Sequence, residues 1–319
     1  MRPFRISQII FTVLINSYIL VFFERALIYT GYLKGFLVPI LNCWSTPTTW
    51  FSCPLGAYQH FIIVKDFPFY VLGFFLLFGA IIGRMACGWL CPFGLFQDLI
   101  FKISKKKLSL PKITPLFTLI FFLLFYFLIW LKFNQLLLVF KILIVFIGII
   151  IGLLLDIFLK IQIRNFDFTS LKYFFLLFLA TFVVFFTNEP WFCKLCPQGT
   201  LEAGIPLVLY DPENSLKSMV GLFFYLKILI LLSIFILAIY IKRVFCRIIC
   251  PIGAIYSIFN KLSLLRLEID KEKCTHCNIC NKVCPTDINV YENPNQTDCI
   301  RCLECYYQCP QKVIKIKVL

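Results

Sequence analysis

Charged residues are scarce in this chain of 319 amino acids. Asp, Glu, Lys and Arg together make up 15% of it, against about 25% in ordinary soluble domains. Hydrophobic residues make up 61%, Phe alone contributes 38 residues, and the mean hydropathy is +0.88. A water-soluble core of this size could not bury so much apolar surface. The composition therefore excludes a soluble globular protein, a disordered chain and a small secreted disulfide domain, and it predicts a membrane protein.

Acidic residues are also few, with 16 against 31 basic residues and a net charge of +15. In a soluble chain such an excess points to nucleic acid. Here the polar tail from Leu267 onward carries seven basic and seven acidic residues, so the excess lies in short loops between apolar segments. This distribution is typical of membrane topology. We therefore expect the lipid bilayer as a partner and no nucleic acid.

Six apolar segments are long enough, or nearly so, to cross a bilayer as helices, which requires roughly 17–25 residues. They cover residues 6–23, 67–83, 114–131, 137–158, 171–187 and 219–241. If the N-terminus is cytoplasmic, the inner loops hold 16 Lys and Arg residues and the outer loops hold 7, which favours this orientation. We expect a multi-pass protein of the cytoplasmic (inner) membrane of a prokaryote, with both termini in the cytoplasm.

The composition changes sharply near residue 267. The segment 267–319 has no apolar run long enough to cross a membrane, and it contains eight of the 16 cysteines. The predicted fold is an all-α polytopic bundle of about six transmembrane helices over residues 1–266, followed by a small cytoplasmic α+β domain over residues 267–319.

Histidine is rare, with two residues, so the cysteines of the tail are its candidate metal ligands. They form two copies of the pattern C-x2-C-x2-C-x3-C-P, which is the run that ligates [4Fe–4S] clusters. The first three thiolates of each copy aim at one cluster, and the fourth points to the other cluster. The expected ligands are Cys274, Cys277, Cys280 and Cys309 for cluster 1, and Cys299, Cys302, Cys305 and Cys284 for cluster 2.

The tail resembles the bacterial-type two-cluster ferredoxins, and all eight ligands are present within about 50 residues. Zinc is the alternative metal, because four thiolates also suit Zn²⁺. Two complete copies that each end in Cys-Pro favour iron–sulfur clusters over zinc.

The other eight cysteines form four pairs, each of which ends in the pattern C-P-x-G. The outer pairs of the expected topology are Cys43 with Cys53 and Cys193 with Cys196, and the inner pairs are Cys87 with Cys91 and Cys246 with Cys250. The order of segments and pairs predicts a pseudo-repeat of residues 1–100 and 171–260. Each face thus has four thiolates, the number that one [4Fe–4S] cluster needs.

Two chemistries are open for these four pairs. Proline after the cysteine suits the start of a helix, where the helix dipole favours an anionic ligand, so each face is a candidate for one more [4Fe–4S] cluster. The outer pairs are also candidates for redox dithiols that exchange disulfides with a periplasmic partner. The inner pairs are also candidates for docking or assembly features without a metal. The first outer pair is irregular, because Thr46 stands where Cys196 stands in the corresponding motif.

The inner motifs, with C-x3-C-P directly after an apolar segment, resemble those of a known family over about residues 84–319. The chain is similar to the membrane ferredoxin-type subunits of periplasmic nitrate reductase systems. It is also similar to the polyferredoxin regions of nitrous-oxide-reductase regulators and of an oxidase-assembly protein. The resemblance implies a multi-pass electron-transfer protein with cytoplasmic clusters, often linked to quinol oxidation. The outer cysteine pairs go beyond the minimal pattern of that family.

The sequence therefore predicts a membrane-bound iron–sulfur protein that relays electrons between a cytoplasmic or quinol donor and a membrane or periplasmic redox partner. Such a subunit is a candidate component of a quinol dehydrogenase. The alternative is an assembly or maturation factor that reduces a metal or a disulfide on a client protein. Among other residues, Lys227 lies within the last apolar segment, where ionisable groups are often functional, and His60 on an outer loop is a candidate proton acceptor.

Overall fold

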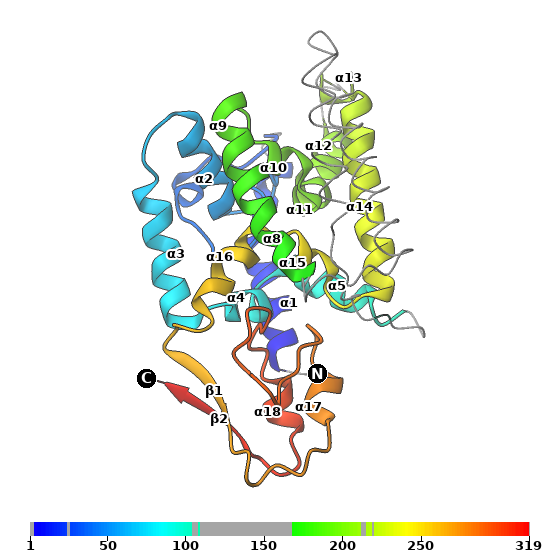
Figure 1. Cartoon of the computed structure of the whole chain (residues 1–319). Coiled ribbons are helices and arrows are strands. Elements are labelled where there is room, and N and C mark those ends of the chain that lie inside the picture. Colours follow the sequence, from blue (N-terminus) through cyan, green and yellow to red (C-terminus); the bar gives the residue numbers. More distant parts are fainter. Residues whose placement is uncertain are drawn as a thin grey trace, which may run out of the picture. The chain divides into compact units, whose positions relative to one another are not determined.

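The computed structural model describes residues 3–23, 26–103, 108, 168–211, 215–218 and 220–318. The chain divides into two compact units, one formed by Met1–Leu108 with Lys172–Leu319 and the other by Ser109–Leu171. The expected membrane segments at residues 114–131 and 137–158 lie outside the described residues. The described part of the first unit is built mainly of helices (Figure 1).

The first half of this unit contains five α-helices and two short 3-10 turns. They are α1 (Pro3–Ile15), η1 (Ile19–Phe22), η2 (Tyr32–Gly35), α2 (Pro54–Ile63), α3 (Phe69–Ile82), α4 (Met85–Trp89) and α5 (Pro92–Ile100). The second half also has short helices at its cysteines, and these lie between longer apolar helices. It begins with α8 (Leu171–Phe174), which follows η3 (Phe168–Ser170) at the end of the other unit, and with the π-helix η4 (Phe175–Phe182), α9 (Val183–Thr187) and α10 (Trp191–Leu195). It continues with α11 (Pro197–Gly199), the π-helix η5 (Thr200–Gly204), α12 (Ile205–Tyr210), α13 (Ser215–Ser218), α14 (Leu222–Tyr240), α15 (Val244–Ile248) and α16 (Pro251–Phe259).

Two described helices are long and apolar enough to cross a membrane. They are the continuous helix Phe168–Thr187, which joins η3, α8, η4 and α9, and α14. The apolar helices α1 and α3 have 13 and 14 residues, which is shorter than the roughly 17–25 residues that a bilayer requires. Six membrane-spanning helices are therefore not observed in the described part of the chain.

The expectation of one continuous helix over residues 6–23 is wrong, because α1 ends at Ile15. The carbonyl of Ile15 accepts hydrogen bonds from the Trp50 amide at 3.0 Å and from the Thr49 hydroxyl at 3.2 Å. The loop between η2 and α2 thus takes over a carbonyl that a longer helix would have used internally. Hydropathy alone cannot show such an ending.

Each C-P-x-G motif starts a helix in the same way. Its second cysteine has extended backbone angles and precedes a proline at the first position of α2, α5, α11 or α16. Proline suits this position because its fixed φ matches the helix and its missing N–H would be unsatisfied there anyway. This local prediction from the sequence is confirmed.

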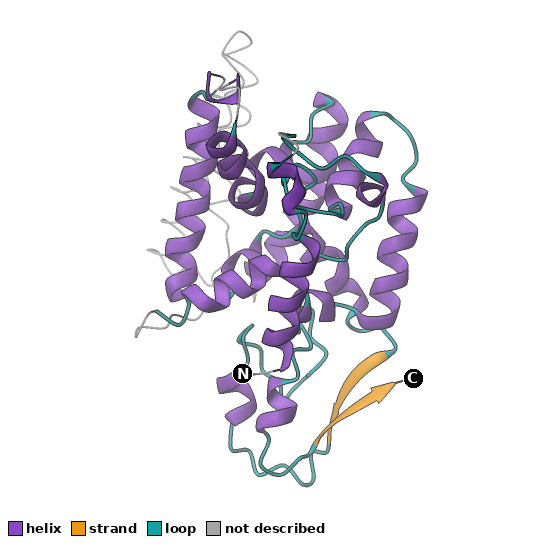
Figure 2. Cartoon of the chain, turned by 180° about the vertical axis from the view of Figure 1, so that it is seen from behind, coloured by secondary structure: helices purple, strands orange, loops and turns teal. Residues whose placement is uncertain are grey.

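The tail forms a small α+β fold of two strands and two short helices (Figure 2). Strand β1 (Leu265–Ile269) pairs antiparallel with β2 (Ile314–Val318), and Leu267 lies opposite Ile316. Between the strands lie α17 (Ile279–Val283) and α18 (Glu304–Gln308), which pack on each other. The tail belongs to the same compact unit as the helices of both halves.

Candidate functional site

The first three cysteines of each tail motif lie in loops with the same unusual backbone. The residues on either side of the middle cysteine have positive φ in both copies, namely His276 and Asn278 in the first and Arg301 and Leu303 in the second. These left-handed conformations are uncommon for residues other than glycine. They turn the chain twice within seven residues and so bring three thiols of each loop to one side.

A cavity of about 250 Å³ lies between the first loop and the end of the second motif. Its lining includes Cys274, Cys277, Cys280 and Cys309. The space is far larger than a single ion or water needs. Cys277 is exposed, and the ring of His276 packs on Tyr291 at 4.4 Å between centroids. The four cysteines expected at cluster 1 thus surround one space that is open to solvent.

A second cavity, of about 20 Å³, lies closer to the helices. Its lining includes Cys284, Cys299, Cys302 and Cys305, all of them buried. Cys302 interacts electrostatically with the other three. Burial raises the pKa of the Cys299 thiol to about 11, so the binding of a metal here would release protons. The structure therefore brings together the same sets of four that the spacing predicts.

The inner cysteines meet where the two halves of the chain contact each other. Cys250 interacts electrostatically with the other three inner cysteines, and all four are buried. Gln97 donates from Nε2 to the Cys246 sulfur at 3.0 Å, and the amide of Gly253 donates to the Cys250 sulfur at 3.4 Å. Hydrogen bonds to sulfur and exclusion of water are among the factors that set the potential of an iron–sulfur cluster.

Two fully buried arginines cross between the inner motifs. Arg84 donates from Nη2 to the carbonyl of Cys246 at 2.9 Å, and Arg243 donates from Nη1 to the carbonyl of Cys87 at 3.0 Å. Each arginine stands three residues before the first cysteine of its own motif. Arg243 also forms a two-pronged pair with Asp98, at 2.9 and 2.6 Å. Sequence reasoning missed these residues, although the spacing R-x2-C-x3-C-P-x-G is identical in both motifs.

The glycine of each C-P-x-G motif lies against the partner motif. A Cβ atom on Gly94 would lie 3.3 Å from Nη1 of Arg243, and one on Gly253 would lie 3.1 Å from Nη2 of Arg84. At the outer pairs, a Cβ on Gly199 would lie 3.4 Å from the sulfur of Cys43, and one on Gly56 3.9 Å from that of Cys193. The four glycines therefore keep room for the motif that crosses each of them.

The outer cysteines are also brought together from both halves. Cys193 interacts electrostatically with Cys53, Cys196 and Cys43. The Gln59 side-chain oxygen accepts from the amide of Cys193 at 3.2 Å. Burial raises the pKa of the Cys43 thiol to about 11. The irregular first pair has nine residues between its cysteines, and both cysteines still belong to this set.

Glu202 closes one side of the outer set. Its carboxylate accepts from the amide of Cys43 at 3.4 Å, and burial raises its pKa to about 8. Lys227 interacts electrostatically with Cys43 and Cys196, and its ammonium lies 5.8 Å from the ring centre of Phe223. The outer set therefore has one acidic and one basic neighbour.

His60 is an exposed residue of α2 and not of a loop, contrary to expectation.

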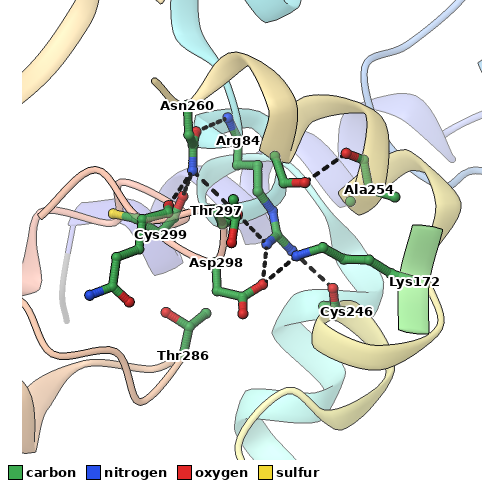
Figure 3. A network of polar contacts seen from close by, with 12 residues as sticks. Arg84, Lys172, Cys246, Ala254, Asn260, Thr286, Thr297, Asp298 and Cys299 are labelled. Carbon is green, nitrogen blue, oxygen red and sulfur yellow. Dashed lines mark hydrogen bonds and ion pairs between the residues drawn. The ribbon is translucent and has the colours of Figure 1, made fainter. Parts of the chain in front are cut away.

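A network of polar contacts joins the tail to the inner motifs (Figure 3). Asp298 accepts from Arg84 at 2.8 Å and from Lys172 at 2.6 Å. Burial by itself would raise the pKa of Asp298, but the two cations hold it below its usual value. Asn260 donates to the carbonyl of Cys299 at 2.7 Å and accepts from the backbone amide of Arg84 at 3.0 Å.

The closest approach of the tail to the inner motifs is at Gly88. A Cβ atom there would lie only 2.5 Å from the carbonyl oxygen of Ile300. Gly88 follows Cys87 directly, and Ile300 lies between Cys299 and Cys302. The neighbouring Trp89 donates from Nε1 to the carbonyl of Arg301 at 2.9 Å. The backbones of the inner set and of the cluster 2 loop are thus in direct contact.

In the described part of the chain, the cysteines are not arranged as the ligands of a single metal ion would be. Among the residues that the structure describes, no three His, Cys, Asp or Glu side chains are arranged to hold a single metal ion. The tail thiols instead line two cavities, and the four thiols of the inner set and the four of the outer set lie in electrostatic range of one another. Four thiols around one space are the donor set of a [4Fe–4S] cluster, and the residues present fit that group.

Comparison with known families agrees with this geometry. The family described as "4Fe-4S binding domain" matches residues 67–111, 173–205 and 223–269. These segments contain both inner pairs and the second outer pair. The family described as "4Fe-4S dicluster domain" matches residues 266–310, the tail with all eight of its cysteines.

Several known proteins are similar to the chain. The uncharacterized protein MJ0749 of Methanocaldococcus jannaschii is 25% identical over 291 residues, which cover 90% of this chain and 80% of that protein. The ferredoxin-type protein NapH of Haemophilus influenzae is 37% identical over 82 residues, 22% of this chain and 28% of NapH. YccM of Escherichia coli, whose name describes it as an electron transport protein, is 31% identical over 75 residues. These residues are 23% of this chain and 21% of YccM. No solved structure matches the chain.

These matches confirm the resemblance drawn from the cysteine motifs. The chain has iron–sulfur ferredoxin domains at both its inner motifs and its tail. Parts of the chain are also similar to a ferredoxin-type protein and to a protein named for electron transport.

Proposed function

We propose that this polyferredoxin-like 4Fe–4S electron-transfer protein carries electrons through four [4Fe–4S] clusters, two in the tail and one at each face of the inner membrane. Cluster 1 is held by the cysteines of the solvent-open cavity and cluster 2 by those of the buried cavity. The inner cluster is held by Cys87, Cys91, Cys246 and Cys250, and the outer cluster by Cys43, Cys53, Cys193 and Cys196. Each bound cluster takes up and gives off one electron without a proton.

The observation that carries the proposal is the contact between the Cys299–Cys302 loop and the inner motif. Gly88 and Ile300 touch through their backbones, and each lies beside a candidate ligand. Arg84 reaches from the same region to Asp298 and to the carbonyl of Cys246. The tail is therefore docked with the loop that would hold cluster 2 directly against the inner motif.

Charge supports the same arrangement. A cluster with four thiolates is an anion, and burying an anion is costly unless positive groups lie near it. Arg84 and Arg243 are both completely buried and interact electrostatically with Cys246. These arginines offset the negative charge while they hold the two halves of the inner motif together.

The membrane placement rests on length, composition and relatives. The helix Phe168–Thr187 and α14 can each cross a bilayer by length and apolar composition, and part of the chain is similar to the ferredoxin-type protein NapH. We place the tail and the inner set on the cytoplasmic side, in agreement with the Lys and Arg distribution. Cluster 1, beside the exposed Cys277, then meets a cytoplasmic redox protein, and the outer cluster meets a periplasmic or membrane partner.

A quinol is the membrane donor that the surface fits best. An apolar groove of about 460 Å³ is lined by residues of α2, α3, η4 and α9, and it contains the hydroxyl pair Tyr58 and Thr181 at 3.1 Å. Thr181 belongs to a π-helix, a local irregularity that often marks functional sites. Tyr58 stands five residues after Cys53, so a quinol headgroup on these hydroxyls would lie near the outer set.

The relay is tested in vesicles of the purified protein. A membrane-impermeant reductant is added on the tail side, and reduction of an impermeant acceptor is followed on the other side. We expect transfer by the unaltered protein and none by Cys246→Ser, whose tail clusters still become reduced. Equal transfer by both proteins, or none by an unaltered protein that holds all its clusters, would overturn the relay.

One observation favours maturation of a client protein as a second candidate function. Cys43 and Cys193 are partly exposed, whereas all four inner cysteines are buried. An outer set without iron could exchange disulfides with a client. Alkylation of Cys43 and Cys193 in the oxygen-free protein distinguishes the two, since only free thiols react.

A further inference from the structure

The four C-P-x-G motifs share one more position that carries a polar side chain and to which the proposed relay assigns no role. Three residues after each glycine, and six after the preceding cysteine, stands a side chain with a polar end. These residues are Gln59, Gln97, Glu202 and Tyr256. Each of them lies in the helix or helical turn that its motif starts, so the four occupy equivalent places.

Three of these side chains contact the first cysteine of the partner motif on the same face. Gln59 accepts from the amide of Cys193 at 3.2 Å, and Glu202 accepts from the amide of Cys43 at 3.4 Å. Gln97 accepts from the Phe245 amide at 3.0 Å and donates to the sulfur of Cys246 at 3.0 Å. The contacts are reciprocal, because each half of the chain supplies the side chain for the cysteine of the other half.

The same relationship directs Tyr256 to Cys87, the first cysteine of the other inner motif. The hydroxyl of Tyr256 interacts electrostatically with Cys87 and, more weakly, with the outer Cys53. The tyrosine ring is 0% exposed and packs against Phe75 at 5.6 Å between ring centres. The side chain is therefore enclosed by protein, with its hydroxyl in electrostatic range of the inner Cys87.

The hydroxyl of Tyr256 has no hydrogen-bond partner among the described residues. A buried hydroxyl without a partner costs roughly 1–3 kcal/mol. Phenylalanine would fill the same space without this cost, so the oxygen needs a partner that protein atoms do not supply. The sulfur atoms of a cluster at the inner set are acceptors in the right place.

We propose that Tyr256 is a positioning residue of the inner cluster, whose O–H donates a hydrogen bond to the Cys87 sulfur or to a neighbouring sulfide of that cluster. This inference rests on the proposed function, because it requires iron at the inner set. With Gln97 on Cys246, the inner cluster then receives one side-chain donor from each half of the chain.

Such a hydrogen bond favours the reduced cluster. One electron adds negative charge that is shared by the sulfur atoms, and a donor to sulfur stabilises that charge. The tyrosine keeps its proton, and no other group is oxidised or reduced in this step. Removal of the hydroxyl should therefore lower the reduction potential of the inner cluster while leaving the cluster in place.

The test compares Tyr256→Phe with the unaltered full chain, purified without oxygen. Iron is counted, and each cluster is titrated by electron paramagnetic resonance at defined potentials. The inner signal is identified as the one that Cys246→Ser lacks. We expect unchanged iron and a ratio of reduced to oxidised inner cluster that falls about threefold to tenfold at a fixed potential, the effect of one lost hydrogen bond. The tail signals should not shift.

Tyr173→Phe is the matched control. The Tyr173 hydroxyl lies 2.6 Å from the hydroxyl of Ser257, the residue that follows Tyr256 in the sequence. Removal of the Tyr173 hydroxyl should leave the reduction potential of the inner cluster unchanged. A second readout needs no shift in potential. In protein prepared in D2O, the N–D groups of Gln97 and Gly253 also couple to the inner cluster, and the unaltered protein should show one further exchangeable deuteron coupling that Tyr256→Phe lacks.

The outcomes separate the two proposals. If the unaltered protein binds iron at the inner set but neither potential nor deuteron coupling changes in Tyr256→Phe, the role of Tyr256 is overturned and the relay stands. If Tyr256→Phe does not assemble, the number of exchangeable deuteron couplings in the unaltered protein decides, and the absence of any coupling beyond those of Gln97 and Gly253 overturns the inference. If the unaltered protein binds no iron at the inner set, the relay and the inference both fail.

Discussion

Arg84 and Asp298 form a 2.8 Å ion pair that joins the inner cysteine motif to the tail. Lys172 reaches the same carboxylate oxygen at 2.6 Å, and both cations are fully buried. Asp298 precedes Cys299, and Arg84 lies three residues before Cys87. One carboxylate thus fixes the distance between two candidate clusters. A buried pair of this kind contributes little beyond an apolar substitute, but the loss of one partner leaves an uncompensated charge.

Asp298→Asn should loosen the tail from the helices. The change leaves two buried cations facing a neutral side chain, which costs about 3–5 kcal/mol. We expect faster amide hydrogen exchange in residues 296–303. Glu268→Gln is the control, because Glu268 pairs with Lys317 at the surface, where such pairs contribute about 1 kcal/mol or less. Equal exchange in the two variants would contradict this role of Asp298.

Gly88→Ala should separate the tail from the inner set. The added methyl would meet the Ile300 carbonyl oxygen at 2.5 Å, and overpacking of this kind costs about 1–3 kcal/mol. We expect weaker magnetic coupling between cluster 2 and the inner cluster. Gly73→Ala is the matched control, since nothing lies within 4 Å of its added Cβ. The proposed route is wrong if Gly88→Ala retains the full coupling.

Arg243→Gln should destabilise the inner motifs more than Arg243→Lys. The glutamine removes the nearer of the two cations that Asp98 faces, leaving Arg5 at 3.6 Å, and it removes the bond to the Cys87 carbonyl, at a cost of up to about 3–5 kcal/mol. Lysine keeps the charge but not the planar fork that binds a carboxylate at two points. Thermal unfolding and iron retention under argon measure both variants. Full iron and an unchanged midpoint in Arg243→Gln would show that the crossing arginines do not hold the site.

Lys227→Met should lower the reduction potential of the outer cluster. Lys227 interacts electrostatically with Cys43 and Cys196, and a nearby positive charge stabilises the reduced, more negative state. The inner potential should not change. The control is Lys65→Met, because Lys65 is exposed. A shift of the inner signal in place of the outer one would refute this assignment of Lys227.

The sequence predicted best what depends on local chain geometry. The spacing in the tail motifs sets which thiols share a loop, and the structure gathers the same sets of four around two cavities. The helix starts at Pro54, Pro92, Pro197 and Pro251 follow from the same kind of local rule. In both cases the deciding interactions lie within a few residues.

Features that depend on distant contacts could not be read from the sequence. The end of α1 at Ile15 is set by hydrogen bonds from Trp50 and Thr49. The hydropathy of residues 6–23 does not depend on these two residues and so cannot predict where the helix ends. Arg84 and Arg243 bind across some 160 residues of sequence. Their matching positions become visible only when the two motifs are aligned on their cysteines and polar neighbours are included.

The most direct test of the account is the iron and sulfide content of the purified chain, handled without oxygen and read together with its electron paramagnetic resonance spectrum. Four clusters predict about sixteen iron and sixteen sulfide per chain, and about twelve of each in Cys246→Ser. About eight of each in the unaltered protein, with signals from the tail clusters alone, would contradict the four-cluster relay.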